Sequence, residues 1–176
     1  MSSMSIDRYD LALLEALQRD GNATNAALGE AVHLSASQVS RRLQRLGELR
    51  IISGYAALID PATIGLGVTA FAQVILERHG QSQSDAFEQA AAAMPEITEC
   101  FSVSGDADYF LRIVASDLQA FSELMMKRVL RLPGVAHIKT NIALQKIKQT
   151  HVLPLDHIAR PVRSRVQLVY AAERGE

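Results

Sequence analysis

The feature that most constrains this chain is residues 34–49, which read LSASQVSRRLQRLGEL. From Val39 to Leu49 the large apolar residues recur at steps of four, three and three. This spacing places them on one stripe of an amphipathic helix. Ser35 is followed three residues later by Gln38, which is a capping-box pattern and predicts that the helix begins at Ser35. The sequence therefore predicts a capped helix whose second face is free to contact another molecule.

That second face carries side chains that can bind DNA. Arginine can donate two hydrogen bonds to guanine or pair with phosphate, and glutamine can recognise adenine. Residues 35–50 contain four arginines and one acid, although the whole chain has a formal net charge of −1. For this helix alone, a solvated basic face is an equally good interpretation. The candidate DNA-binding residues are Ser35, Ser37, Gln38, Arg41, Arg42, Gln44 and Arg45.

Two shorter helices are predicted upstream of residue 35. The first follows Asp7 and ends near residue 20, and the second runs over residues 24–32. Residues 33–35 are a short turn that makes the second and third helices cross steeply, which is helix-turn-helix geometry. Gly29 either permits a close approach of these two helices or is an incidental weak helix former, and we favour the packing role.

These residues resemble the Lrp/AsnC (leucine-responsive, feast/famine) family of transcriptional regulators. The matching segments are Ile6-Asp7, Asp10, residues 17–21, the spaced pattern from Leu34 to Leu46, Gly54-Tyr55 and Ala57. The chain departs from the family where His33 and Arg50 replace frequent glycines and Ala27 replaces a frequent glutamate. Because histidine adopts positive φ at modest cost, these departures bear on turn geometry and leave the fold unchanged.

The amino-acid composition is typical of a globular protein. Its 176 residues are 48% hydrophobic and 21% charged, enough to bury a core in one large or two small domains. Cys100 is the only cysteine, which excludes an intramolecular disulfide framework and a multi-cysteine zinc site. No basic-led apolar leader and no apolar run of membrane-spanning length is present, so we expect a cytoplasmic protein without a membrane partner.

The patterning predicts an α+β chain with two folded parts. We expect a helix-turn-helix, winged-helix-like domain in residues 1–53 and an extended linker in 54–67. Residues 68–150 follow the order strand, helix, strand, strand, helix, strand, which predicts a ferredoxin-like βαββαβ domain. Residues 151–176 form a C-terminal extension, either an added strand or a loose tail.

The second domain is expected to serve effector binding and oligomerisation. A sheet with helices on one face leaves the other face open, which favours a homodimer that also presents two recognition helices about 34 Å apart. Residues 103–111 and 130–135 resemble the Lrp/AsnC effector domain, and the resemblance implies higher assembly, up to an octamer, and a small-molecule amino acid effector.

The turn at residues 104–108 is the predicted effector site. A free amino acid needs an acceptor for its ammonium group beside N–H donors for its carboxylate, and glycine and aspartate supply both. The alternative is that the aspartates only complete a tight turn. The resemblance implies these effector-binding residues: Ser104, Gly105, Asp106, Asp108, Tyr109 and Thr140.

Other chemistry has little support in the sequence. The histidines are scattered, no catalytic triad order or phosphate loop is present, and two carboxylates make a weak metal site. We therefore expect no catalytic residue, no metal and no cofactor. The alternatives are a tetrapyrrole-pathway decarboxylase of the same two-domain architecture and an architectural DNA-binding protein without a ligand.

Overall fold

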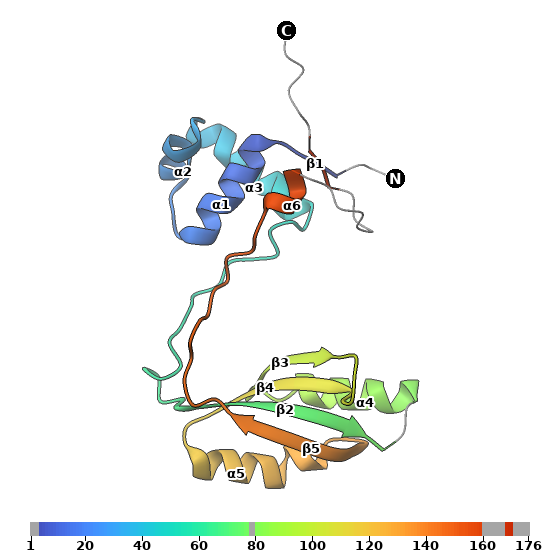
Figure 1. Cartoon of the computed structure of the whole chain (residues 1–176). Coiled ribbons are helices and arrows are strands. Elements are labelled where there is room, and N and C mark those ends of the chain that lie inside the picture. Colours follow the sequence, from blue (N-terminus) through green and yellow to red (C-terminus); the bar gives the residue numbers. More distant parts are fainter. Residues whose placement is uncertain (1–3, 78–79, 160–167, 171–176) are drawn as a thin grey trace. The chain divides into compact units, whose positions relative to one another are not determined.

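The computed structural model describes residues 4–77, 80–159 and 168–170 (Figure 1). The chain divides into two compact units. The first contains residues 1–57 and 149–176, and the second contains residues 58–148. The first unit is therefore discontinuous in sequence, and the C-terminal extension belongs with the helix-turn-helix.

The first unit is built on three helices, and each begins where a side chain caps it. They are α1 (Arg8–Arg19), α2 (Asn25–Val32) and α3 (Ala36–Glu48). Asp7, Thr24 and Ser35 accept hydrogen bonds from the first free backbone N–H groups of these helices. Asp7 forms a reciprocal capping box with Asp10, and Ser35 forms one with Gln38. The predicted helix starts are confirmed.

The turn between α2 and α3 depends on close backbone packing. His33 adopts the left-handed conformation with φ of 57°, and the Leu34 N–H donates to the Gly29 carbonyl at 2.9 Å. A Cβ atom added to Gly29 would lie 2.4 Å from the Leu34 carbonyl oxygen, so the packing role of this glycine is confirmed. Arg50 also has positive φ, 55°, where it ends α3 in place of the family's usual glycine.

A small sheet of the first unit joins the two ends of the chain. Strand β1 (Met4–Ile6) pairs in parallel with β6 (Leu168–Tyr170). Residues 51–67, which follow α3, carry no strand, so the described chain has no wing hairpin at this position. A short helix, α6 (Asp156–Ala159), also packs in this unit.

The second unit contains a four-stranded antiparallel sheet with the order β3-β4-β2-β5. This topology confirms the ferredoxin-like βαββαβ prediction. Its elements are β2 (Val68–Leu76), α4 (Gln81–Ala92), β3 (Ile97–Ser102), β4 (Tyr109–Ala115), α5 (Leu118–Lys127), the 3-10 turn Val129–Arg131 and β5 (Val135–Ile142).

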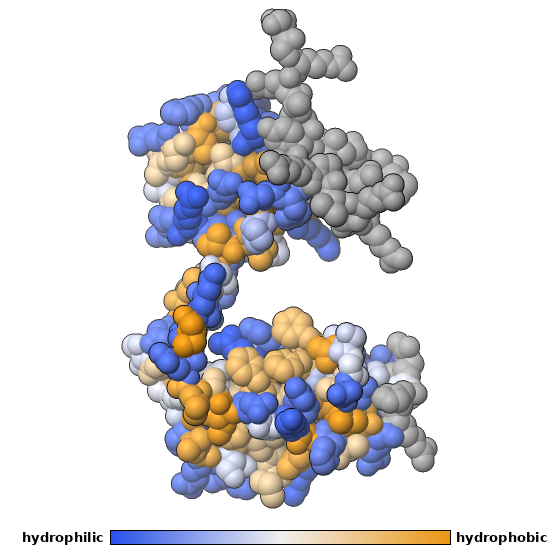
Figure 2. All heavy atoms as spheres, in the orientation of Figure 1, coloured by the Kyte–Doolittle hydropathy of each residue, from blue (hydrophilic) through white to orange (hydrophobic). Residues whose placement is uncertain are grey.

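Both helices of this unit cover the same face of the sheet. Alternate residues of β2 are buried against apolar side chains of α4 and α5, including Phe87 and Phe121. On the opposite face the rings of Phe71 and Phe110 stack with centroids 5.8 Å apart. Phe101, in register with Phe110, is 54% exposed. Figure 2 shows apolar side chains gathered among polar ones on the surface of this unit.

Candidate DNA-binding helix and effector pocket

The exposed face of α3 carries part of the predicted DNA-binding set. Ser37, Arg41 and Gln44 lie at helical spacing and are all exposed. Val39 and Leu46 are completely buried on the other side of the helix. Gln44 donates a hydrogen bond to Glu48 at 2.9 Å, which orients its amide along the helix surface.

Two further candidates of this set close the N-terminal end of α3. The Ser35 hydroxyl accepts from the Gln38 N–H at 3.3 Å, and the Gln38 side-chain oxygen accepts from the Ser35 N–H at 2.9 Å. Both side chains remain exposed. The N-terminal end of a helix with free N–H groups favours an anionic neighbour such as a phosphate.

Arg42 and Arg45 have a different environment, because both form ion pairs with α1. Arg42 donates to Asp7 and Asp10 at 2.8 Å each, and Arg45 donates to Asp10 at 3.0 Å. Asp10 is 1% exposed, whereas Arg42 is 24% and Arg45 is 43% exposed. Arg45 also donates to the Ser5 carbonyl. The two guanidinium groups therefore attach α3 to α1 and β1.

The charge states of this cluster reinforce the ion pairs. Burial alone would raise the pKa of Asp7, but hydrogen bonds from the Asp10 N–H and Arg42 outweigh it and lower the pKa. Burial alone would lower the pKa of Arg42, and its bonds to Asp10 and Asp7 reverse that effect and raise it. Both groups are therefore charged at neutral pH.

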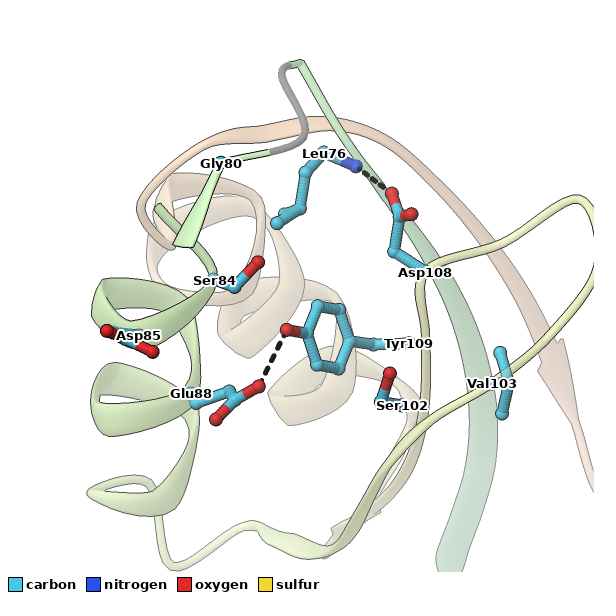
Figure 3. A pocket seen from close by; sticks show the side chains of 9 residues that line it. All are labelled: Leu76, Gly80, Ser84, Asp85, Glu88, Ser102, Val103, Asp108 and Tyr109. Atoms are coloured by element: carbon cyan, nitrogen blue, oxygen red, sulfur yellow. Dashed lines mark hydrogen bonds between the residues drawn. The ribbon is translucent and has the colours of Figure 1, made fainter. Parts of the chain in front are cut away.

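A pocket of 380 Å³ opens beside β4 in the second unit (Figure 3). The Tyr109 hydroxyl points from β4 toward α4 and donates to the Glu88 carboxylate at 2.8 Å. Asp108 accepts from the Leu76 backbone N–H at 2.8 Å, which attaches the β3–β4 connection to the end of β2. The lining residues are Leu76, Gly80, Ser84, Asp85, Glu88, Ser102, Val103, Asp108 and Tyr109.

Tyr109 joins the pocket to the core. Its ring packs on Phe87 with centroids 4.5 Å apart. Burial raises the pKa of Tyr109; Ser84 lowers it by hydrogen bonding, and the Glu88 carboxylate raises it further. The phenol therefore remains protonated at neutral pH, and its single proton is donated to Glu88.

The structure divides the predicted effector residues. Asp108 and Tyr109 line the pocket. Ser104, Gly105 and Asp106 lie exposed on the β3–β4 turn, where Gly105 has φ of 119°. Thr140 pairs with Ala72 in the middle of β5 and is not part of the lining.

Sequence reasoning missed the contribution of α4 to the pocket. Ser84 and Glu88 both line it, and they are four residues apart on α4, so they share one helix face. That spacing was visible in the sequence, but nothing there related it to Tyr109. In the same way, Asp7 and Asp10 carry the family resemblance, but their spacing in the sequence does not indicate that they pair with Arg42 and Arg45.

The described part of the chain lacks two other kinds of feature. Within residues 4–77, 80–159 and 168–170, no three His, Cys, Asp or Glu side chains come together in a metal-binding arrangement. None of the helices found there has the length and apolar character needed to cross a membrane.

Comparison with known proteins identifies the family. Residues 6–47 match the AsnC-type helix-turn-helix domain, and residues 69–153 match the Lrp/AsnC ligand binding domain. The chain is 34% identical to the leucine-responsive regulatory protein of Escherichia coli (strain K12) over 148 residues, which are 84% of this chain and 90% of that protein. The chain belongs to the Lrp/AsnC family. It is thus a DNA-binding transcriptional regulator with an α+β fold.

Solved structures of other regulators share this architecture. A transcriptional regulator from Neisseria meningitidis, in complex with L-Met, superposes with a TM-score of 0.83 at 35% identity, covering 87% of this chain and 99% of that one. An AsnC family regulator from Agrobacterium tumefaciens gives 0.82 at 31% identity, covering 86% and 99%. The feast or famine regulatory protein of M. tuberculosis, complexed with L-methionine, gives 0.75 at 26% identity, covering 82% and 96%.

Proposed function

We propose that this regulator binds DNA through the exposed face of α3 and changes its DNA occupancy when an amino acid binds in the pocket beside Tyr109. The observation that carries the DNA part is the exposed row of Ser37, Arg41 and Gln44 on a helix whose other side is buried. Arg41 supplies the guanine or phosphate contact and Gln44 the contact to adenine. Ser35 and Gln38 bring the capped helix end to a backbone phosphate.

Arg42 and Arg45 contribute less directly to DNA binding in this proposal. Because each already donates to Asp10, their first role is to hold α3 in position. Arg45 remains 43% exposed, so its outer edge is available to a phosphate. This assignment separates the predicted set into side chains that contact DNA and side chains that orient the helix.

The effector part of the proposal rests on the pocket and on two relatives. Structures of the Neisseria and mycobacterial regulators contain L-methionine. Here the carboxylates of Glu88 and Asp85 can accept from an ammonium group, and the Tyr109 hydroxyl, by donating to Glu88, holds that carboxylate in place. Ser104, Gly105 and Asp106 on the adjoining turn remain candidates for contact with the ligand where a second copy of the chain approaches.

We further propose that the protein acts in the cytoplasm as a homodimer that assembles to a higher oligomer, up to an octamer. The open sheet face, with Phe71, Phe101 and Phe110, supports a contact with a second copy of the chain. An effector then acts by binding one arrangement of dimers more tightly than another, because equal affinity would shift nothing.

The DNA-binding proposal is tested with Arg41→Ala and Gln44→Ala. The target is a duplex selected from a random-sequence pool by the wild-type protein. Each substitution should weaken binding by about 1–3 kcal/mol per lost base contact while the oligomer stays intact. Arg19→Ala is the matched control, because Arg19 is an exposed arginine on α1. Footprints unchanged in both Arg41→Ala and Gln44→Ala would show that this face of α3 does not bind the DNA.

The effector proposal is tested with a thermal-shift panel of the free amino acids. An amino acid that binds should raise the unfolding midpoint of the wild type by an amount that grows with the logarithm of one plus the ratio of its free concentration to Kd. Tyr109→Phe keeps the ring packed on Phe87 but removes the hydroxyl, so the shift should shrink. Tyr55→Phe, an exposed tyrosine of the linker, is the control. A panel without any shift would favour an architectural DNA-binding protein.

A further inference from the structure

We propose that the C-terminal segment from Leu153 to Ile158 is a positioning element for the DNA-binding helix, because it completes the core against which α3 packs. The family's ligand-binding domain matches only as far as residue 153, so most of this segment lies beyond it. The DNA readout of this proposal rests on the proposed function, whereas its stability and exchange readouts do not.

Ile158 supplies the apolar contact. It is 6% exposed and packs in one cluster with Ile6, Leu14 and Leu46. Leu46 is a completely buried residue of α3, and Leu43 of α3 packs against the same cluster. The short helix that carries Ile158 is closed by a hydrogen bond from the Ile158 N–H to the Leu155 carbonyl at 3.0 Å. The segment thus fills space directly beneath the DNA-binding helix.

Leu153 supplies a polar anchor on α1. Its N–H donates to the Gln18 side-chain oxygen at 2.6 Å, and its carbonyl accepts from the Gln18 amide nitrogen at 3.2 Å. One glutamine therefore satisfies both backbone groups of one residue, which fixes where the returning chain meets the helix. This anchor is independent of the apolar contact made by Ile158.

The strand pairing at the chain ends provides a third attachment. β6 pairs in parallel with β1, with Ser5 in register with Val169. The Ser5 carbonyl also accepts from Arg45 of α3, and Ile6 is completely buried beside Leu46. Since β1 contacts α3 through both a hydrogen bond and an apolar contact, its pairing with the tail also acts on the placement of α3.

The order of the two units along the chain connects these attachments to the effector domain. The effector unit, residues 58–148, is inserted into the DNA-binding unit and is connected to it at both ends. The second connection begins after β5, which ends at Ile142, and leads to the Leu153 anchor. A displacement of β5 therefore has a direct covalent route to the core beneath α3, in addition to the linker that follows α3.

The test compares Ile158→Ala with Ile158→Val and with Ile147→Ala in the full-length protein. Ile147 lies on the same returning chain and is 83% exposed. Ile147→Ala therefore removes the same side-chain atoms as Ile158→Ala without removing a buried contact. The unfolding midpoint of each variant is measured first. Three further quantities are then measured at a temperature well below the midpoint of every variant. They are the amide hydrogen exchange of α3, the Kd for the duplex selected by the wild type and the Kd for an unrelated duplex of equal length.

Ile158→Ala should lower the unfolding midpoint by about 8 °C or more, while Ile158→Val should lower it by only a few degrees. Exchange in α3 should accelerate about tenfold with α4 unchanged. The Kd for the selected duplex should rise about tenfold, and the Kd for the unrelated duplex should stay within about twofold, because phosphate contacts tolerate small helix displacements.

Two results would overturn the proposal. In the first, Ile158→Ala behaves like Ile147→Ala in its midpoint and in α3 exchange, so the segment is not part of the core. In the second, the midpoint falls but α3 exchange is unchanged, so the segment stabilises the unit without positioning the helix. A wild type that does not distinguish the two duplexes contradicts the proposed function instead, and α3 exchange then still decides this proposal.

Discussion

The Arg42 guanidinium of α3 lies 2.8 Å from the buried Asp10 carboxylate of α1, and Arg45 reaches the same carboxylate from the next turn. The Asp10 carboxylate therefore pairs with two guanidinium groups. Its Oδ2 atom, which accepts from Arg45, also accepts from the Asp7 N–H at 3.1 Å. This arrangement determines which arginines of α3 are available to DNA. It also makes Asp10 the one acid that both arginines share, so its charge contributes to the stability of this unit.

Asp10→Asn should destabilise the DNA-binding unit by roughly 2–3 kcal/mol, which is below the usual cost of breaking a buried ion pair because both guanidinium groups are partly solvated. Asparagine keeps one acceptor oxygen but removes the charge that pairs with Arg42 and Arg45. The free energy of unfolding is measured by urea denaturation followed by circular dichroism.

Glu15→Gln is the control for Asp10→Asn. Glu15 is an exposed acid on the same helix, so its change removes one negative charge without touching the cluster. Its free energy of unfolding should stay within about 0.5 kcal/mol of the wild type. Equal values for the two variants would contradict the role given to Asp10.

The lowered pKa of Asp7 predicts how stability depends on pH. A carboxyl whose pKa is lower in the folded state stabilises the fold above its unfolded pKa, about 4, and that contribution is lost as the pH falls toward the folded value. The unfolding midpoint should therefore drop less steeply below pH ~4 in Asp7→Asn than in the wild type. Asparagine still caps a helix, so the comparison isolates the charge.

Other acids titrate in the same range, and the comparison must allow for them. Asp117, which caps α5, Glu123 on α5, and Asp60 also have lowered pKa values because of their hydrogen bonds. They contribute equally to both proteins, so the difference between the two curves belongs to Asp7. Parallel curves from neutral pH to pH ~3 would contradict the prediction.

The sequence predicted the helix starts of the DNA-binding unit because capping is a local interaction. Ser35 and Gln38 are three residues apart, and the capping box they form needs no other part of the chain. The left-handed conformation of His33 could also be foreseen from the resemblance, because the family often has a glycine at this turn and histidine adopts positive φ at modest cost.

The partners of Arg42 and Arg45 were not predictable from spacing. Their hydrogen bonds to Asp10 connect residues more than thirty positions apart in the chain, and a charge count around α3 treats all its arginines alike. The pocket has the same limitation, because it forms where α4 approaches Tyr109. The return of the tail to α1 depends on Gln18 and Leu153, which carry no recognisable signal in the sequence.

Gly29→Ala tests the packing at the turn before α3. Alanine is the better helix former by about 1 kcal/mol, but its Cβ would lie 2.4 Å from the Leu34 carbonyl oxygen. Because a backbone atom must move, the steric cost should outweigh the propensity, and we expect a net loss of about 1–3 kcal/mol. Chemical denaturation measures the free energy of unfolding.

Gly47→Ala gives the matched comparison, since Gly47 is also helical and its added Cβ would meet nothing within 4 Å. Without a steric cost, the higher helix propensity of alanine should raise the free energy of unfolding by up to about 1 kcal/mol. If both variants were stabilised equally, Gly29 would be an incidental residue of α2 without a packing role.

Phe101→Glu tests the contact proposed for the open sheet face. The side chain is half exposed beside the stacked rings of Phe71 and Phe110, so a charge there should leave the fold intact and oppose burial against a second copy. Light scattering after size exclusion should show a protein at least about half converted to monomer. Met126→Glu, on the outer side of α5 and also exposed, should keep the wild-type mass. A Phe101→Glu protein with wild-type mass at micromolar concentration would place the subunit contact on another surface.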